Sequence, residues 1–226
     1  MIKIAPSILA ADFTKLGSEI KSVESADYAH FDVMDGMFVP NISFGFSVLE
    51  SIRKITTMAL DVHLMINKPS RYIARFAKAG ADIITFHVEA ETSDNILSAI
   101  DEIHEHGKKA GLSIKPKTPT EALLPYIDSL DLILVMTVEP GYGGQEFMSD
   151  MLPKIMKIRE EINKHNPDCE LEVDGGINLE TARLCIDAGA NVLVAGSDIF
   201  NASDRAAQIS LLRSNLWNTS PQHWKS

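Results

Sequence analysis

Short apolar runs rich in β-branched residues recur along the chain, and such runs are typical of buried strands. The chain holds eight of them, separated by longer and more polar segments. The runs cover residues 2–9, 28–34, 59–65, 82–88, 109–114, 132–138, 171–175 and 192–196. We therefore predict a protein built on eight strands.

Most segments between these runs carry apolar residues at helical spacing. Several of these segments end in a glycine, Gly80, Gly107 or Gly189, as expected where the last helical turn needs a left-handed residue. The helical segments are 13–25, 48–55, 70–81, 95–107, 151–165 and 179–190. Strands and helices thus alternate, which favours a (β/α)8 barrel, although an open doubly wound sheet would show much the same pattern.

The length and composition of the chain support one compact domain. Its 226 residues fall within the ~200 to 250 residues of many single-domain barrels. Hydrophobic residues make up 45% and charged residues 23% of the chain, which allows a sizeable core and gives disorder no support. We therefore predict a single α/β domain, a (β/α)8 TIM barrel, over residues 1–226.

Reactive and polarisable side chains lie at or near the C-terminal ends of the predicted strands. In a barrel these ends share one face, on which barrel enzymes build their sites. The residues concerned are Ser7, His30, Asp32, Met34, His63, Met65, His87, Met136 and Asp174. This clustering makes the barrel the preferred fold and places a candidate site at its mouth.

Two histidines and two aspartates of this set form a candidate metal site. His30 and Asp32 are two residues apart on one strand and point the same way, His63 holds the equivalent place on the next strand, and Asp174 ends the seventh. Taken singly, each is explained as a hydrogen-bonded or loop-capping residue. Their repetition at matched strand ends favours a divalent ion, with Zn as first choice and Fe(II), Co and Mn sharing the same ligands.

Three methionines, Met34, Met65 and Met136, also recur at strand ends. Ordinary core packing explains any one of them. Together they predict an apolar collar that contacts the substrate and excludes water above the metal.

Glycine is concentrated in the loops that follow the last three predicted strands. Glycine allows backbone N–H groups to approach an anion closely, and barrel enzymes often bind phosphate in the late loops. Turn formation explains any single pair. The predicted phosphate cradle comprises Gly143, Gly144, Gly175, Gly176, Gly196 and Ser197.

The net charge and the small number of cysteines exclude several classes of function. A formal net charge of −10 argues against a general nucleic-acid binder, but not against a small phosphate held by backbone N–H groups. Cys169 and Cys185 are too few for a disulfide framework and too far apart for a redox pair. With no membrane-spanning run and no signal peptide pattern, we expect a cytoplasmic protein without membrane contacts.

Seven ordered motifs between about residues 4 and 200 resemble the ribulose-phosphate 3-epimerase family. They are APSILAADF, HFDVMDGMFVPN, DVHLM, TFHVE, MTVEPGYGGQEF, EVDGGI and VAGSDIF. The resemblance implies a divalent metal on the four ligands named above, with Asp32 and Asp174 as the paired acid and base. It also implies interconversion of D-ribulose 5-phosphate and D-xylulose 5-phosphate in the pentose phosphate pathway, substrate contacts from Ser7, His63 and the glycine loops with Gln145, and a homo-oligomer.

Three positions depart from the usual family pattern, which has Asn at Glu139, Asn at Lys115, and often His or Asn at Met37. These changes leave the metal and acid–base residues intact and affect the rim. A related branch acts on D-allulose 6-phosphate and tends to have FAGQ where this chain reads YGGQ, so the chain resembles that branch less.

Two other functions are compatible with a barrel. Lys115, at the end of the fifth predicted strand, would suit a Schiff-base aldolase or decarboxylase, but a solvated rim lysine is the simpler reading and the DxKxxD motif of related synthases and decarboxylases is absent. A non-catalytic sugar-phosphate sensor would need no paired acid and base. The tail from about residue 214, with Trp217 and Trp224, either docks on the barrel or frays.

Overall fold

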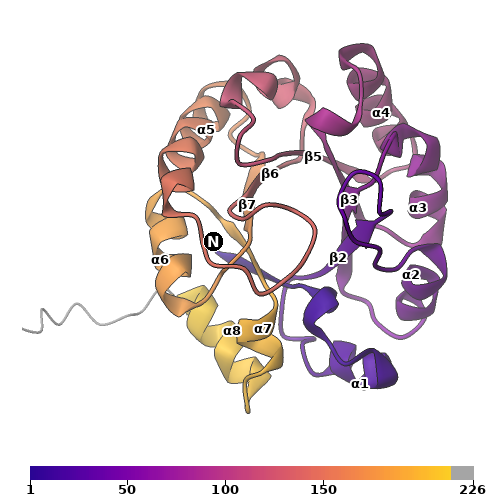
Figure 1. Cartoon of the computed structure of the whole chain (residues 1–226), viewed down its shortest axis with the longest axis vertical. Coiled ribbons are helices and arrows are strands. Elements are labelled where there is room, and N and C mark those ends of the chain that lie inside the picture. The colour runs from indigo at the N-terminus through magenta and orange to yellow at the C-terminus, as the bar shows by residue number, and fades with distance from the viewer. Residues whose placement is uncertain (215–226) are drawn as a thin grey trace, which may run out of the picture.

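A computed structural model describes residues 1–214 as an eight-stranded parallel sheet that closes nearly into a barrel, with helices around its outside (Figure 1). The strands are β1 (Lys3–Pro6), β2 (Tyr28–Met34), β3 (Ala59–Met65), β4 (Ile83–His87), β5 (Lys109–Ile114), β6 (Leu132–Met136), β7 (Glu170–Asp174) and β8 (Val192–Ala195). Every predicted strand is present, and the predicted barrel is confirmed over the open sheet. Trp217 and Trp224 lie outside the described residues.

The helices follow most of the predicted helical segments. They are α1 (Leu16–Lys21), α2 (Phe46–Arg53), α3 (Ile73–Ala79), α4 (Ser93–Glu105), α5 (Leu152–His165), α6 (Leu179–Asp187), α7 (Ser197–Phe200) and α8 (Arg205–Ser214). The glycines expected to end helices, Gly80, Gly107 and Gly189, all have positive φ. Between β5 and β6 the chain forms two short 3-10 segments instead, Thr120–Ala122 and Leu124–Ser129. Within residues 1–214, no helix has both the length and the apolar character needed to cross a membrane.

The sheet closes between its first and second strands. The order of paired strands runs β1-β8-β7-β6-β5-β4-β3-β2, all parallel. β1 pairs with β8 along its whole length, whereas it meets β2 at a bridge between Ser7 and His30. The closing contact therefore lies at the C-terminal end of β1, beside the candidate site.

The barrel interior is divided between apolar and polar side chains. Residues at alternate positions of a strand point inward, and an apolar cluster drawn mainly from β1, β6 and β8 includes Ala5, Leu134 and Val194. Inward residues of β2, β3, β4, β5 and β7 include a buried polar set. Its members are His30, Asp32, Asp61, His63, Thr85, His87, Ser113 and Glu172. The polar half of the interior lies next to the predicted metal ligands, and the site is built on it.

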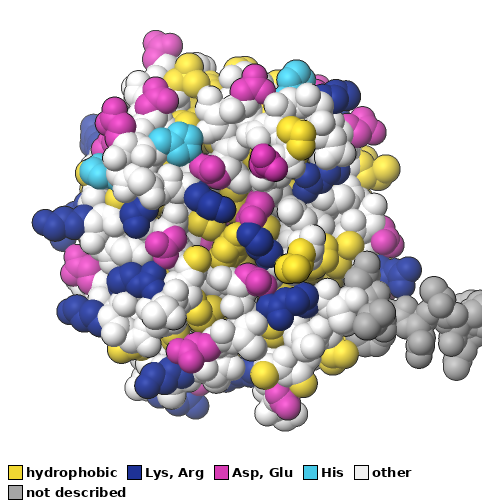
Figure 2. Space-filling view, turned by 180° about the vertical axis from the view of Figure 1, so that it is seen from behind, with side chains coloured by type: hydrophobic (Ala, Val, Ile, Leu, Met, Phe, Trp, Pro, Cys, Tyr) yellow, Lys and Arg dark blue, Asp and Glu magenta, His cyan; other side chains and the backbone are white. Residues whose placement is uncertain are grey.

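The face opposite to that of Figure 1 shows acidic and basic side chains intermixed over the described surface (Figure 2). Nucleic acids are bound by clustered Lys and Arg. This face offers no such cluster, in agreement with the net charge.

Candidate metal and substrate site

The four predicted metal ligands converge at the C-terminal end of the barrel. Asp32 and His63 are neighbours in the register of β2 and β3, and Asp174 ends β7 across from them. One ligand atom from each of the four residues lies within 4.8 Å of the others. His30 Nε2 lies 3.4 Å from Asp32 Oδ1 and 3.9 Å from Asp174 Oδ2, and His63 Nδ1 lies 3.3 and 3.9 Å from the same two atoms. Two ring nitrogens thus face the same two carboxylate oxygens.

One buried atom of this group tests whether a metal ion fits. His30 Nε2 is buried without a hydrogen-bond partner in the structure, while the other ring nitrogen, Nδ1, is 2.6 Å from Asp61 Oδ2. A ligand histidine characteristically donates its second ring N–H to a carboxylate in this way. An unpartnered imidazole nitrogen beside two carboxylates is a donor set that suits a divalent transition-type ion.

The charges around His30 determine its protonation when no ion is bound. Burial lowers the pKa of His30, but the nearby carboxylates of Asp61 and Asp32 outweigh it and hold the pKa well above 6.5. A proton then occupies Nε2 between the carboxylates. Binding of a metal ion would displace that proton, so ion affinity should rise with pH.

The two aspartates have opposite pKa shifts. Burial raises the pKa of Asp32, but the adjacent His30 and His63 outweigh it and lower the pKa overall; Ser7 Oγ also donates a 2.6 Å hydrogen bond to Asp32 Oδ2. Burial, followed by the like charge of Asp32, raises the pKa of Asp174 to about 7. The pair therefore offers one carboxyl that is ionised at neutral pH and one that exchanges its proton near neutral pH, which suits acid–base catalysis on two faces.

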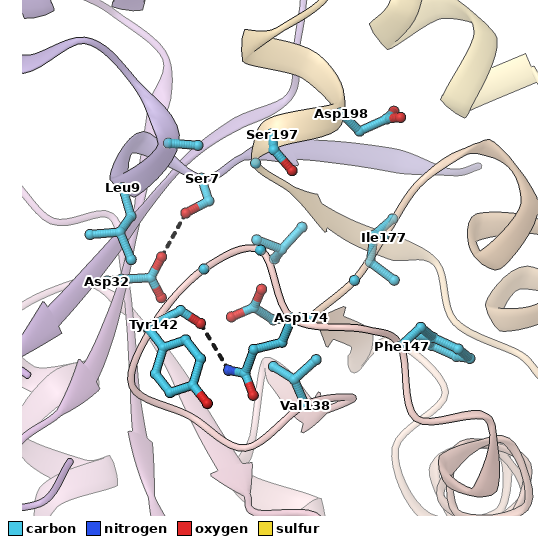
Figure 3. Close-up of a pocket in the computed structure, with 18 of the residues that line it drawn as sticks. Ser7, Leu9, Asp32, Val138, Tyr142, Phe147, Asp174, Ile177, Ser197 and Asp198 are labelled. Atoms are coloured by element: carbon cyan, nitrogen blue, oxygen red, sulfur yellow. Dashed lines mark hydrogen bonds between the residues drawn. The ribbon is translucent and has the colours of Figure 1, made fainter. Parts of the chain in front are cut away.

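A pocket of about 1130 Å³ opens above the two carboxyl groups. Figure 3 shows Asp32 and Asp174 pointing toward each other at its floor, with Ser7 beside Asp32. The predicted collar residues Met34, Met65 and Met136 line the same floor and are almost fully buried. His30 and His63 are fully buried beneath the floor. His63 therefore supports the carboxyls from below, and its contact with substrate stays a prediction.

The predicted phosphate cradle lies along one wall of this pocket. All six of its members line the pocket: Gly143, Gly144, Gly175, Gly176, Gly196 and Ser197. Gly176 has a φ of +65°, and a Cβ there would lie 2.6 Å from the backbone N of Phe147. The loop after β7 can therefore pack against the loop after β6 only with glycine at this position.

Gln145 lines the pocket, where its substrate contact stays a prediction, and its side chain also makes hydrogen bonds within its own loop. Its side-chain amide donates to the backbone carbonyls of Glu139 at 2.6 Å and Tyr142 at 2.9 Å. Both acceptors belong to the same loop. The geometry makes Gln145 a brace of the loop after β6.

The positions that depart from the family pattern lie around the rim. Met37 is 77% exposed, and Glu139 is also exposed. The Lys115 ammonium lies 3.7 Å from the centre of the Phe38 ring, and Lys115 is not among the pocket-lining residues. This arrangement gives a Schiff-base role for Lys115 no support.

Three buried residues around the ligands were given no role by the sequence analysis. Asp61 contacts His30, His87 Nε2 lies 2.9 Å from His63 Nε2, and Glu172 lies 3.9 Å from His30 Nδ1. Asp61 and Glu172 each precede a predicted ligand by two residues, so strand alternation could have placed them in the interior. Burial lowers the pKa of His63, and that of His87 to about 4.

Replacing Glu172 with Gln should stabilise the protein by an amount that grows as pH rises. Burial and the charge of Asp61 raise the pKa of Glu172 well above 4.5, so folding takes up a proton above about pH 4.5 and the free energy of unfolding falls as pH increases. Gln keeps the neutral shape and does not titrate. The difference in free energy of unfolding between variant and wild type, from denaturant titrations, should therefore grow from about pH 5 to about pH 8.

The control for Glu172 is the exposed Glu24. Glu24→Gln should show no such pH-dependent gain. A constant difference for Glu172→Gln across the pH range would contradict a neutral Glu172.

Comparison with known proteins shows which family this chain is similar to. The chain matches the model of the ribulose-phosphate 3 epimerase family over residues 3–200. A ribulose-phosphate 3-epimerase of Bacillus subtilis (strain 168) is 52% identical over 216 residues, covering 94% of this chain and 99% of the relative. One from Synechocystis sp. is 47% identical, covering 95% and 94%, and a cytoplasmic isoform from Oryza sativa subsp. japonica is 44% identical, covering 95% and 94%.

Solved structures with low sequence identity share the fold. A 3-hexulose-6-phosphate synthase is 20% identical with a TM-score of 0.67, covering 95% of this chain and 99% of that one. KGPDC from Streptococcus mutans is 14% identical with a TM-score of 0.73, covering 96% and 100%. At these identities the likeness supports the barrel alone.

Proposed function

Because the chain belongs to the ribulose-phosphate 3-epimerase family, we propose that it interconverts D-ribulose 5-phosphate and D-xylulose 5-phosphate in the pentose phosphate pathway. The observation that carries this proposal is the pair of carboxyl groups, Asp32 and Asp174, facing each other at the floor of one pocket with opposite pKa shifts. A non-catalytic sensor has no use for such a pair.

Inversion of a carbon next to a carbonyl requires two acid–base groups. The proton on carbon three leaves from one face and a proton returns on the other, through an enediolate. One residue cannot readily reach both faces. Asp32 on β2 and Asp174 on β7 come from opposite walls, so the ionised carboxyl acts as base, the protonated one acts as acid, and the roles exchange in the reverse direction.

His30, Asp32, His63 and Asp174 would hold one divalent ion, for which Zn is the first choice and Fe(II), Co and Mn are alternatives. When bound, the ion supplies positive charge that stabilises the negative charge developing on the substrate oxygens. The residues themselves set its position: Asp61 orients His30 through a 2.6 Å hydrogen bond, and Ser7 orients Asp32.

The remaining pocket residues would position the sugar phosphate. The glycine loops after β6 and β7 and the Gly196–Ser197 turn would bind the phosphate through backbone N–H groups. Met34, Met65 and Met136 would exclude water around carbons two and three, which strengthens the electrostatic interactions there. Holding the substrate at both ends orients the reacting carbon between the two carboxyls.

An epimerase assay with two substrates tests this proposal. Purified protein should convert D-ribulose 5-phosphate, and a chelator should abolish the conversion. Preference for D-allulose 6-phosphate would move the assignment to that branch. Binding of both sugar phosphates without turnover of either, at full metal content, would overturn the proposal in favour of a sensor.

Changing Gly176 to Ala should impair substrate use. A Cβ at this positive-φ position would push against the backbone of Phe147 and shift the loop, and a shift of this kind should lower kcat/KM for ribulose 5-phosphate by about 10- to 100-fold. Gly17 is the matched control, because it does not line the pocket and a Cβ there makes only an ordinary 3.5 Å contact with Ile55 Cδ1. Gly17→Ala should stay within about twofold of wild type, and equal effects of the two changes on kcat/KM would count against the packing argument.

A single domain over residues 1–226, a cytoplasmic location and a homo-oligomeric state stay predictions. Size-exclusion chromatography with light scattering tests the oligomeric state directly.

A further inference from the structure

Two buried histidines and the exposed Glu89 connect the candidate metal site to the base of the loop after β5. His63 Nε2 on β3 lies 2.9 Å from His87 Nε2 on β4, and His87 Nδ1 lies 3.1 Å from Glu89 Oε2. Both rings are fully buried, and the ring of Phe38 packs on His87 with centroids 4.9 Å apart. Water therefore has little access to the contact between the two rings, and their protein neighbours determine where its proton lies.

The contact between the two rings contains one proton, because two facing nitrogens at 2.9 Å need one donor and one acceptor. Either His63 donates to His87, or His87 donates to His63. In the second case with neutral rings, His87 Nδ1 would carry a lone pair facing Glu89. The carboxylates at the two ends compete. Glu89 Oε2, 3.1 Å from His87 Nδ1, favours the first arrangement, whereas Asp32 Oδ1, 3.3 Å from His63 Nδ1, favours the second. The shorter contact is that of Glu89, and a bound ion would occupy the His63 Nδ1 lone pair and end the competition.

Glu89 is an ionised acceptor. Its Oε1 accepts from the backbone N–H of Lys115 at 2.8 Å and from the Thr118 hydroxyl. Burial raises the pKa of Glu89, but hydrogen bonds from His87, Thr118 and Lys115 outweigh it and lower the pKa to about 2. A carboxylate at Oε2 requires a donor, so His87 Nδ1 bears the hydrogen, His87 Nε2 accepts, and His63 Nε2 donates.

We propose that His87 and Glu89 are positioning residues that hold His63 in the tautomer with hydrogen on Nε2, leaving the Nδ1 lone pair directed at Asp32 and Asp174. This inference deepens the proposed metal site and rests on it. His30 is the counterpart: Asp61 contacts its Nδ1 directly, which leaves the lone pair on Nε2. The two histidines thus present opposite ring nitrogens to one point, and an outer carboxylate determines each choice.

Glu89→Gln should reverse the direction of the hydrogen bonds that link Glu89, His87 and His63. The Lys115 N–H needs an acceptor, so the amide oxygen of Gln takes the Oε1 position and the amide NH2 faces His87 Nδ1. His87 then carries its hydrogen on Nε2 and donates to His63, whose remaining hydrogen moves to Nδ1, inside the metal site. Ion binding must then drive a tautomer change, and Zn²⁺ affinity should fall by about 10- to 100-fold.

The matched control is Glu91→Gln. Glu91 lies two residues further along and accepts from the backbone N of Ser70 and from Asn95 Nδ2, with no contact to either histidine. Its replacement should leave the tautomers and Zn²⁺ affinity unchanged. Thermal unfolding of both variants reports any general loss of stability.

The test combines two measurements: ¹⁵N chemical shifts of the histidine rings in metal-free protein, and Zn²⁺ affinity by chelator competition. The inference is supported if wild-type His63 is protonated on Nε2 and Glu89→Gln moves that proton to Nδ1 with the expected loss of affinity. It is overturned if wild-type His63 carries its proton on Nδ1, if wild-type His87 is doubly protonated, or if Glu89→Gln changes neither tautomer nor affinity.

The results that would contradict the proposed function differ from those that would contradict this inference. A wild-type protein with the expected tautomers and Zn²⁺ binding but no epimerase activity would contradict the function and leave the positioning chain standing. An active wild type with the wrong tautomer would do the reverse.

Discussion

Replacing Asp174 with Asn is expected to abolish turnover and leave the barrel folded. Asn keeps the shape of the side chain, and the backbone carbonyl of residue 174 still accepts the 2.8 Å hydrogen bond from Thr137 N. What is lost is a carboxyl that gives and takes protons. Loss of one acid–base group costs roughly 100- to 10,000-fold in rate, and Asp32→Asn should behave alike.

Solvent-deuterium exchange into carbon three of ribulose 5-phosphate measures the proton step directly. Each variant should fold with a near-native circular dichroism spectrum and exchange far more slowly than wild type. Asp128→Asn, whose side chain is 79% exposed, is the matched control and should exchange normally. Undiminished exchange in both Asp32→Asn and Asp174→Asn would contradict the two-carboxyl assignment.

Removal of divalent metal is expected to have an effect of similar size. Without an ion, His30 Nε2 has a carboxylate at 3.4 Å and another at 3.9 Å, and a proton there leaves the substrate oxygens without the charge that stabilises them. Dialysis against EDTA should remove nearly all activity. Addition of Zn, Fe(II), Co or Mn should restore it to different degrees, which ranks the candidate ions.

Metal binding should also raise the thermal stability of the protein, because an ion that binds only the folded state shifts the unfolding equilibrium by mass action. The melting temperature should therefore rise with ion concentration. Full activity in protein shown by elemental analysis to be metal-free would contradict metal dependence, and the exchange assay would then show whether the two carboxyls suffice.

The sequence predicted the fold well because strands and helices alternate with clear periods. The polar strand-end positions then made the barrel the better choice, and they do share one face. The connection between β5 and β6 differs from the other units, because Pro119 directly precedes its first 3-10 segment, Pro125 lies in the first turn of its second, and proline restricts the residue before it.

The convergence of the four predicted ligands could be anticipated from the sequence, whereas the contacts of their outer neighbours could not. His30, Asp32, His63 and Asp174 could be found because each stands at a strand end. The role of His87 and Glu89 depends on which ring nitrogen faces which neighbour, and strand alternation carries no information on that. The hydrogen bonds of Gln145 within its own loop were not predicted for a related reason, because a motif does not show which way an amide points.

The closing contact of the barrel carries one more consequence. Ser7 bridges to His30 and donates to Asp32, so the residues that join the first strand to the second also belong to the ligand set or touch it. Local unfolding that separates β1 from β2 would therefore disperse the site before the rest of the barrel opens. Occupancy of the site should oppose this opening, and amide hydrogen exchange near the seam should slow when the site is filled.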